Sequence, residues 1–570
     1  MPIGTKLAQV LVKFIVNATV MEWENGTLAE TLRESAQARK LIFVNDKTFP
    51  QLLEETAERN GNRVFLVYGE RRLSYRQMNE YSNRLAHRLI EAGVQPGDGV
   101  GIMMSNSPEF LFAFFGAQKA GGYAVPVNTD LKRDGLCYIL NHSQTKTLFI
   151  DRAFLGSLEQ VLTALTTLQR VIVFDEMSPG LEQLDDGLEN MRYWLRPGLA
   201  NHNPSIKLST DSLSCLMYTS GTTGLPKAVT YRHGNSGNKQ LVALGRTFFN
   251  SRDIFYTPLP LFHANALTVT TVMALGVNGQ MVLGKKFSAS QFWKEIREHH
   301  ATTFNALGGM IPILLKQSPS ELDPHNDLRL VLSSATPAHQ FIEFEKRFSV
   351  KLVEAYGAVD GGGFACLNVG DAPAGSIGKP LSGKHRIVNE HGDDMAPGQP
   401  GELVFWVGNR KSSEYFKDER ATSEHVKDGW LHTGDAVRAD KDGFLYFVGR
   451  VTESMRRRGE NVSAHEVETR VCKYPDVLEC AAYGVRAEVG EQDIMVTLVP
   501  VEGRTLDLND LYHFLEEQLP RYAMPRFINV VQELPKTGTH RVVKKELEQI
   551  GVTSTTVDME QRMASMRVSQ

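Results

Sequence analysis

The decapeptide YTSGTTGLPK, residues 218–227, combines hydroxyl side chains, glycines and a lysine in a pattern that suits an anion. Glycines let backbone N–H groups approach an anion closely, the hydroxyls add donors, and Lys227 adds positive charge. The stretch is not a Walker loop, because the pattern GxxxxGK[ST] is absent. A polar turn between strands is the alternative, since serine and threonine are common in turns.

A second candidate anion-binding loop lies near the C-terminus, in the sequence TGTHRVVKK at residues 537–545. It is basic and rich in hydroxyl groups, and Arg541 is one of its cations. The two loops are far apart in the sequence, so a shared ligand would require separate parts of the chain to meet.

The first half of the chain alternates strand and helix patterns that would position these loops. Residues 64–69 and 99–104 are typical of strands, and an amphipathic helical pattern over 74–93 lies between them. The apolar run at 212–217 predicts a strand directly before the glycine-rich loop. Strands separated by helices of about ten to fifteen residues indicate βαβ units. We therefore predict an α/β fold with a mostly parallel sheet covered by helices.

The sequence pattern changes twice further along. Beyond Ala374 the strands are shorter and turns more frequent, and after Arg450 the chain is typical of a compact α+β module. The boundary segment is short and charged, which suits a hinge better than a flexible linker. We predict a large α/β domain of several subdomains over residues 1–449 and a small mobile α+β domain over 450–570, with a hinge in the segment 449–461.

The composition narrows the class of protein. The 570-residue chain is 42% hydrophobic and 22% charged, which is ordinary for a globular protein with a buried core. Its net charge of −4 argues against general nucleic-acid binding. Five scattered cysteines without a CxxC pair argue against a disulfide framework and a structural zinc, and they favour a reducing, cytoplasmic location.

One apolar run near the N-terminus, LVKFIV at residues 11–16, bears on membrane contact. It is interrupted by Lys13 and is too short to span a bilayer, and no run elsewhere approaches about 20 residues. We expect no transmembrane segment. A helix packed on the body of the protein is the favoured explanation, and weak peripheral membrane contact is the alternative.

The phosphate-loop explanation becomes the stronger one when further segments are added in chain order. YTSGTTGLPK resembles the phosphate loop of the adenylate-forming superfamily, which includes acyl-CoA synthetases, luciferases and adenylation domains. The segments that follow also resemble this superfamily: PLFHANAL, EAYGAVDGG, GSIGKP, GWLHTGD, RRRGENVS and LPKTGTHRVVKKEL. RRRGENVSAHEVE and VPVNTDLKRDGLCYILNHS are most similar to acyl-CoA ligases of the carnitine- and crotonobetaine-CoA ligase type and to fatty acid transport proteins.

This resemblance implies an AMP-forming acyl-CoA ligase, an acid–thiol ligase in fatty acid metabolism. A carboxylate would attack the α-phosphorus of ATP to give an acyl-adenylate and pyrophosphate, and coenzyme A would then displace AMP. The implied cofactors and co-substrates are ATP, Mg²⁺ and coenzyme A, and the remaining partner is a small-molecule carboxylic acid.

The resemblance also implies a role for individual residues. The β- and γ-phosphates would be held by Thr219, Ser220, Gly221, Thr222, Thr223, Gly224 and Lys227. Adenine would stack on Tyr356, with Ala355 and Gly357 beside it and Ala335, Thr336 and Pro337 along its other face. The ribose would be held by Asp435, with Arg450 close by. Mg²⁺ would be held by Thr223 and Asp360, and His263 would gate the acyl pocket or assist the arriving carboxylate.

Two departures from the superfamily pattern affect the catalytic residues. Val359 and Asp360 replace a threonine and a glutamate, so one hydroxyl is lost and the metal-binding carboxylate is one methylene shorter. Arg541 replaces the lysine that bridges the α-phosphate and the carboxylate, and His540 replaces a glycine beside it. Arginine keeps the charge but has a bulkier, planar head group, so we predict that Arg541 takes the role with altered geometry, with Lys536, Lys544 or Lys545 as candidate helpers. The alternative is that adenylation from ATP is slow and that the enzyme mainly forms thioesters or runs in the reverse, ATP-forming direction.

Rotation at the hinge would bring first the Arg541 loop and then the RRRGEN segment to the same adenylate. Rotation at Glu453 would replace the Arg541 loop by the RRRGEN segment, where Gly459 allows close approach of the pantetheine arm and Arg458 meets coenzyme A phosphates. A solvated charge run is the alternative for these arginines.

The acyl group is expected to lie among small and mostly apolar residues, which favours an aliphatic or alicyclic acid over an amino acid. These residues belong to the segments His263–Asn265, Asn305–Met310, Ser333–Ala335 and Gly357–Gly363. Two rival functions stay open: a ligase that uses a carrier protein or an amine as acceptor, and a catalytically impaired relative that binds acyl groups or nucleotides.

Overall fold

The computed structural model describes residues 48–176, 188–219, 226–234, 236–307, 309–334, 336, 338–358, 360, 363–369, 372–381, 384–408, 414–457, 460–487, 492–537 and 542–568. The chain divides into two compact units. The first comprises Met1–Ala374, Gly378–Gly383 and Val407–Leu431, and the second comprises Gly375–Ile377, Lys384–Trp406 and His432–Gln570.

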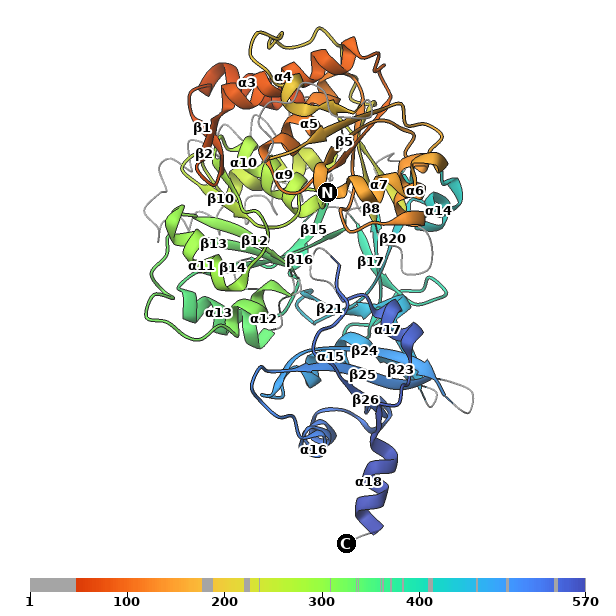
Figure 1. Ribbon diagram of the computed structural model, residues 1–570. Coiled ribbons are helices and arrows are strands. Elements are labelled where there is room, and N and C mark those ends of the chain that lie inside the picture. Colours follow the sequence, from red (N-terminus) through yellow and green to blue (C-terminus); the bar gives the residue numbers. More distant parts are fainter. Residues whose placement is uncertain are drawn as a thin grey trace. The chain divides into compact units, whose positions relative to one another are not determined.

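The first unit contains a seven-stranded sheet that carries the start of the glycine-rich loop (Figure 1). Its six neighbouring strands from β7 to β8 are parallel, and β9 pairs with β8 in the antiparallel direction. In spatial order the strands are β7 (Glu189–Asn190), β6 (Arg170–Phe174), β5 (Thr145–Asp151), β3 (Gly99–Met103), β4 (Tyr123–Pro126), β8 (Leu213–Thr219) and β9 (Lys227–Arg232).

A nine-stranded sheet forms the other half of the first unit. Its six strands from β14 to β1 are parallel. β15 and β2 pair with the two outer strands of this group in the antiparallel direction, and β16 pairs with β15, also antiparallel. In spatial order they are β16 (Lys379–Pro380), β15 (Gly363–Leu367), β14 (Lys351–Ala358), β13 (Leu330–Ser334), β12 (Thr303–Leu307), β10 (Ile254–Thr257), β11 (Gln280–Leu283), β1 (Val64–Tyr68) and β2 (Arg71–Ser74). The mostly parallel, helix-covered α/β architecture predicted from the sequence is confirmed.

Helix boundaries in this unit follow local capping chemistry. Ser74 caps α4 (Tyr75–Glu91) by accepting from the backbone of Gln77, whose side chain accepts from the backbone of Ser74 in return. Ser107 caps α5 (Pro108–Lys119), which is buried on all sides because it packs between the sheets and α4. The other helices of the unit are α3 (Phe49–Asn60), α6 (Arg133–His142), α7 (Leu155–Glu159), α8 (Met191–Trp194), α9 (Ser236–Phe248), α10 (Thr271–Gly276), α11 (Ala289–Glu298), α12 (Met310–Leu315), α13 (Ala338–Phe348) and α14 (Glu419–His425).

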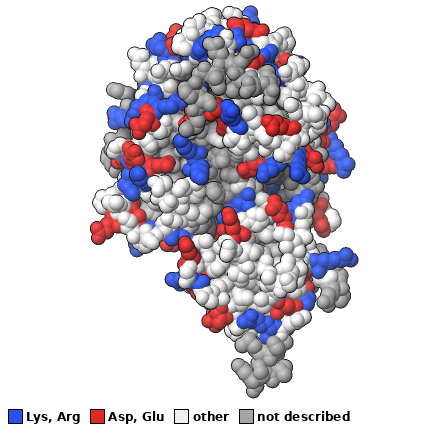
Figure 2. Space-filling model, in the orientation of Figure 1, with Lys and Arg blue, Asp and Glu red and all other residues white. Residues whose placement is uncertain are grey.

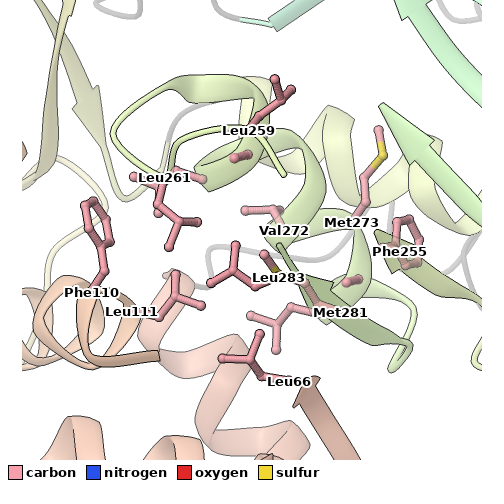
Figure 3. Close-up of a cluster of buried hydrophobic side chains, with 14 of the residues drawn as sticks. Leu66, Phe110, Leu111, Phe255, Leu259, Leu261, Val272, Met273, Met281 and Leu283 are labelled. Atoms are coloured by element: carbon pink, nitrogen blue, oxygen red, sulfur yellow. The ribbon is translucent and has the colours of Figure 1, made fainter. Parts of the chain in front are cut away.

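Part of the hydrophobic core of the first unit is drawn in Figure 3. It joins β1, α5, β10, β11 and α10 through Leu66, Phe110, Leu111, Phe255, Val272, Met273, Met281 and Leu283. Leu259 and Leu261 add the segment that follows β10, and Leu261 points toward Leu111. This segment leads to His263, so the core fixes the approach to a predicted site residue.

The second unit contains two sheets and a hairpin. One small sheet consists of β17 (His385–Val388), β18 (Gly401–Trp406), β20 (Trp430–Ala439), β19 (Val426–Lys427) and β21 (Leu445–Arg450), with the first two residues of β20 and all of β19 in the first unit. After β22 (Ser454–Arg457) and β23 (Glu460–Ser463) comes a four-stranded sheet of β24 (Val477–Arg486), β25 (Gln492–Pro500), β26 (Phe527–Val530) and β27 (Val557–Asp558). The helices are α15 (Ala464–Val471), α16 (Leu508–Gln518), α17 (Lys544–Ile550) and α18 (Met559–Val568).

The compact second unit extends further upstream than the predicted boundary at 449/450. Strand pairing explains the difference, because β21 pairs with β20 and β18 pairs with β17 in the same small sheet. Glu453 therefore lies within this unit. A swivel of the C-terminal domain at Glu453 remains a prediction.

The distribution of surface charge and the character of the helices relate to two predictions, that the protein does not bind nucleic acid and has no transmembrane segment. On the face in Figure 2, acidic and basic side chains are interspersed without a dominant basic patch. Among the described residues, no helix has the length and apolar character that crossing a membrane requires. The apolar run at 11–16 lies outside the described residues.

Candidate active site

Four neighbouring parallel strands of the nine-stranded sheet end beside residues that the sequence singled out. β10 leads to His263, β12 contains Asn305, β13 ends at Ser334 just before Thr336, and β14 carries Tyr356. Carboxyl ends of parallel strands lie on one edge of a sheet, where α/β proteins bind ligands. The structure thus brings the predicted acyl and adenine residues to a common edge.

His263 is held by its neighbours in the chain and by one distant residue. Leu259 and Leu261 are buried in the core on its N-terminal side. The side-chain amide of Asn106 donates to the carbonyl of Leu259 at 3.0 Å, and its oxygen accepts from the N–H of Leu261 at 2.8 Å. His263 then directly precedes a helix that begins with a π-helical segment, Asn265–Thr270. Such π-helical turns are frequent at functional sites.

The imidazole of His263 is uncharged at neutral pH. Burial lowers the pKa of His263 to about 4, because the charged form would lose its hydration. Its Nε2 atom is buried and has no hydrogen-bond partner within the described residues. A neutral imidazole with an unused ring nitrogen is suited to a hydrogen bond with a substrate, and a pKa this low makes it a poor proton acceptor.

The predicted adenine residues lie on two adjacent strands. Tyr356 is half-buried near the end of β14, between buried Ala355 and exposed Gly357. The hydroxyl of Ser334 donates to the carbonyl of Ala355 at 2.7 Å. The backbone N–H of Thr336 donates to the Glu354 carboxylate at 3.2 Å, so the segment after β13 is tied to β14. Ala335 and Pro337 lie outside the described residues.

The glycine-rich stretch connects β8 and β9. Thr219 and Lys227 are opposite each other in this antiparallel ladder, and the hydroxyl of Thr219 donates to the carbonyl of Lys227 at 3.4 Å. The strand predicted over 212–217 is confirmed as β8. The remaining predicted phosphate ligands lie outside the described residues: Ser220, Gly221, Thr222, Thr223 and Gly224.

Asp360 lies in a polar cluster that the sequence did not reveal. The phenol of Tyr415 donates to Asp360 Oδ2 at 2.8 Å, and His425 Nε2 lies 3.9 Å from the same oxygen. Lys227 Nζ lies 5.2 Å from the centre of the Tyr415 ring, within the range of a cation–π contact. Two of the predicted catalytic residues, Lys227 and Asp360, are therefore linked through Tyr415.

Tyr415 is positioned by β9, beside the glycine-rich stretch. It forms a β-bridge with Val229, and the neighbouring N–H of Phe416 donates to the carbonyl of Ala228 at 2.8 Å. The hydroxyl of Thr422 accepts from the N–H of Tyr415 at 3.0 Å. No spacing rule connects Tyr415 with Asp360, because the contact depends on strand pairing between distant segments.

The chemistry of Asp360 fits a role in binding Mg²⁺. Its Oδ2 accepts from Tyr415 and lies near His425, and a carboxylate oxygen is a usual ligand of Mg²⁺. The described part of the chain has no group of three or more His, Cys, Asp or Glu residues arranged to hold a metal. Mg²⁺ bound here would take most of its oxygen ligands from nucleotide phosphates and water, which is its usual mode with nucleotides.

The second unit contains the predicted ribose residues. Asp435 and Arg450 are opposite each other in the β20–β21 ladder, and Arg450 Nε lies 3.2 Å from Asp435 Oδ1. The Asp435 side chain is 7% exposed and that of Arg450 is 40% exposed, so the arginine keeps contact with solvent. Arg458, Gly459 and Arg541 lie outside the described residues, and their roles remain predictions.

Two family models match the chain. The model described as AMP-binding enzyme matches residues 53–411, more than half of the chain, and that described as AMP-binding enzyme C-terminal domain matches residues 466–541. The chain belongs to the AMP-binding enzyme family. The adenylate-forming resemblance inferred from the sequence is thereby confirmed.

Curated relatives of this AMP-binding enzyme match it over most of their length. Crotonobetaine/carnitine–CoA ligase of Escherichia coli O8 (strain IAI1) is 28% identical over 519 residues, which are 87% of this chain and 98% of the relative. The protein of the same name from Salmonella arizonae is 30% identical over 489 residues, 83% of this chain and 93% of the relative.

Solved structures share the fold of this AMP-binding enzyme. The anthranilate CoA ligase AuaEII in complex with anthranoyl-AMP has a TM-score of 0.80 at 23% identity and covers 89% of this chain and 98% of its own. ATP-bound MatB from Rhodopseudomonas palustris has a TM-score of 0.77 at 24% identity, and the match covers 88% of this chain and 98% of the MatB chain.

Proposed function

We propose that this AMP-binding enzyme is an AMP-forming acyl-CoA ligase. In the first half-reaction, a carboxylate oxygen attacks the α-phosphorus of ATP, and the bond to pyrophosphate breaks. In the second, the sulfur of coenzyme A attacks the acyl carbon, the thiol proton is lost, and AMP leaves. The proposal rests mainly on one observation: residues suited to an acyl group and an adenine lie within or after four neighbouring parallel strands of one sheet.

The described residues suit distinct tasks in adenylation. The neutral His263 would hydrogen-bond the arriving carboxylate, and Tyr356 would stack on adenine. Lys227 would counter phosphate charge, while Asp360, oriented by Tyr415, would hold Mg²⁺. The metal would neutralise charge on the phosphates and pyrophosphate, so that two anions can approach each other.

The nucleotide would also involve the second unit. The carboxylate of Asp435 would accept from the ribose hydroxyls, and Arg450 would lie beside it. Arg541 would bridge the α-phosphate and the carboxylate during adenylation. Rotation at Glu453 would then bring Arg458 and Gly459 to coenzyme A.

We further propose an aliphatic or alicyclic acid as substrate and the cytoplasm as the location. The small side chains of Ala306 and Ser334, which follow Asn305 and Ser333, support an aliphatic or alicyclic acid. The five cysteines, all free thiols in the structure, suit a reducing compartment.

A panel experiment tests the proposed function. The purified protein is incubated with ATP, Mg²⁺ and aliphatic, alicyclic, aromatic or amino acids, with and without coenzyme A, and AMP and pyrophosphate are measured. We expect sustained AMP release only with coenzyme A and one class of acid. Release that depends on an amine or carrier protein instead would favour the other acceptor class, and no release with any acid would contradict a ligase.

A further inference from the structure

A partly buried cluster of three charged side chains lies in the second unit and includes the proposed hinge residue Glu453. Lys544 Nζ lies 3.0 Å from Glu453 Oε2 and 2.8 Å from Glu468 Oε1. The side chains of Lys544, Glu453 and Glu468 are 17%, 24% and 19% exposed. Burial disfavours the charge of Lys544, but the two carboxylates hold its pKa above the ordinary value. Lys544 is therefore a charged ammonium shared by two carboxylates.

The two partners of Lys544 differ in what holds them. Glu468 belongs to α15, and its Oε1 also accepts from the N–H of Ala482 in β24 at 2.8 Å. It is therefore fixed to the framework of the domain. Glu453 belongs to the short 3₁₀ segment Val451–Glu453, where the swivel is proposed. Rotation of the backbone at Glu453 would change its contact with Lys544, whereas the contact between Lys544 and Glu468 would persist.

Lys544 also lies at the base of the loop that carries Arg541. It is the first residue of α17. A β-bridge between Lys536 and Val542 closes the loop, and the N–H of Val543 donates to the carbonyl of Pro535 at 2.8 Å. On the other side of the loop, Lys536 binds Glu479 of β24 at 2.7 Å. Each end of the loop is thus attached to the domain by a lysine.

Removing Lys544 would leave Glu453 and Glu468 as neighbouring, partly buried carboxylates. Like charges in a poorly solvated site repel, and an uncompensated buried charge is costly. Because Glu468 is anchored by β24, Glu453 is the side chain that would move toward solvent. The 3₁₀ segment would then lose its ion pair with Lys544.

We infer that Lys544 is a positioning residue that ties the hinge residue Glu453 to the base of the Arg541 loop. This inference rests on the proposed function, because it concerns the balance between the two half-reactions. While the Glu453–Lys544 contact exists, the hinge and the adenylation loop move as one piece. Without it, the Arg541 loop is placed less well for adenylation, whereas thioester formation, in which another segment would replace that loop, is less affected.

The test compares Lys544→Met with Lys544→Arg and with Lys545→Met, a matched control on the exposed neighbouring residue. Adenylation is measured as acyl-dependent pyrophosphate–ATP exchange, and thioester formation as single turnover of preformed acyl-adenylate with coenzyme A. We expect Lys544→Met to lower the ratio of the adenylation rate to the thioester-formation rate about tenfold, as is typical for loss of a coupled contact. Lys544→Arg and Lys545→Met should keep the ratio within about twofold.

Two further measurements separate this inference from the proposed function. Hydrogen exchange of the segment 449–455 needs no substrate, and it should speed up in Lys544→Met but not in Lys545→Met. If the wild type forms no adenylate, the proposed function fails while hydrogen exchange still tests the contact. If Lys544→Met does not fold, Glu453→Gln carries the same test. Equal loss of both half-reactions without rescue by arginine, or unchanged hinge exchange, would overturn the inference.

Discussion

The phenol of Tyr415 donates a hydrogen bond to Oδ2 of Asp360 at 2.8 Å, although the two residues are 55 positions apart in the chain. Asp360 is one methylene shorter than the glutamate of related sequences, so its direction is important for reaching a cation. By donating to one carboxylate oxygen, Tyr415 restricts the orientation of the Asp360 side chain.

Tyr415→Phe should therefore raise the Mg²⁺ concentration that gives half-maximal adenylation. We expect a rise of about tenfold, because a hydrogen bond to a charged group contributes about 1.5–3 kcal/mol. The measurement is pyrophosphate–ATP exchange titrated with Mg²⁺ at fixed ATP. Tyr522→Phe, at an exposed tyrosine, is the control. An unchanged Mg²⁺ dependence in Tyr415→Phe would show that the phenol does not orient the metal ligand.

Arg541→Ala should reduce acyl-dependent pyrophosphate–ATP exchange by about a hundredfold, because it removes a charged contact made in the transition state. Arg541→Lys keeps the charge and should retain most of the exchange. Thioester formation from preformed acyl-adenylate should change much less in either variant. Equal exchange in wild type and Arg541→Ala would exclude the bridging role.

Asp435→Asn should raise the KM for ATP about tenfold, because a charged hydrogen-bond acceptor is replaced by a neutral one beside Arg450. The KM for the carboxylate should stay the same, since the pair is assigned to the ribose. Asp442→Asn, on the exposed turn between β20 and β21, provides a control of the same chemistry. A parallel rise in both KM values would point to a structural rather than a nucleotide-binding role.

His233 should make the stability of the protein sensitive to acid. It is 2% exposed, both ring nitrogens lack hydrogen-bond partners among the described residues, and burial lowers its pKa to about 4. Between pH 6.5 and 4 the unfolded chain binds a proton here that the folded chain does not. The free energy of unfolding therefore falls as pH falls through this window, by at most about 1.4 kcal/mol per pH unit from this residue.

Urea unfolding of wild type and His233→Asn at several pH values between 4.5 and 7 measures this contribution. The variant should show a shallower dependence on pH, even if it is less stable overall. His391→Gln, on an exposed turn, should follow the wild type. Equal slopes for wild type and His233→Asn would mean that His233 is not the proton-binding group.

Much of the fold was predictable because its signals are local. The strand over 212–217 follows from an apolar run, and the helix over 74–93 follows from apolar residues at helical spacing. Their order along the chain also predicted the parallel sheet. The boundary between the compact units was less predictable, because it depends on which short strands share a sheet.

The site was predictable only where a motif names its residues. Lys227, Asp360, Tyr356 and Asp435 could be found from the sequence, since each lies in a segment with a recognisable pattern. Tyr415 could not, because its place beside Asp360 depends on a β-bridge to β9. The contact of Lys544 with Glu453 could not be predicted either, because it joins two residues that are 91 positions apart in the chain.

The amide of Asn106 has a consequence for engineering substrate preference. It contacts the backbone on both sides of the turn before His263, from a position 155 residues away from Leu261. It also donates to the carbonyl of Gly284, at the end of β11, at 2.9 Å. If residues 258–270 were replaced by the segment of another ligase, the new side chains would lack the matching hydrogen bonds from position 106 that fix the backbone before His263. Chimeras that exchange this segment together with the stretch around Asn106 should therefore retain more activity than those that exchange the segment alone.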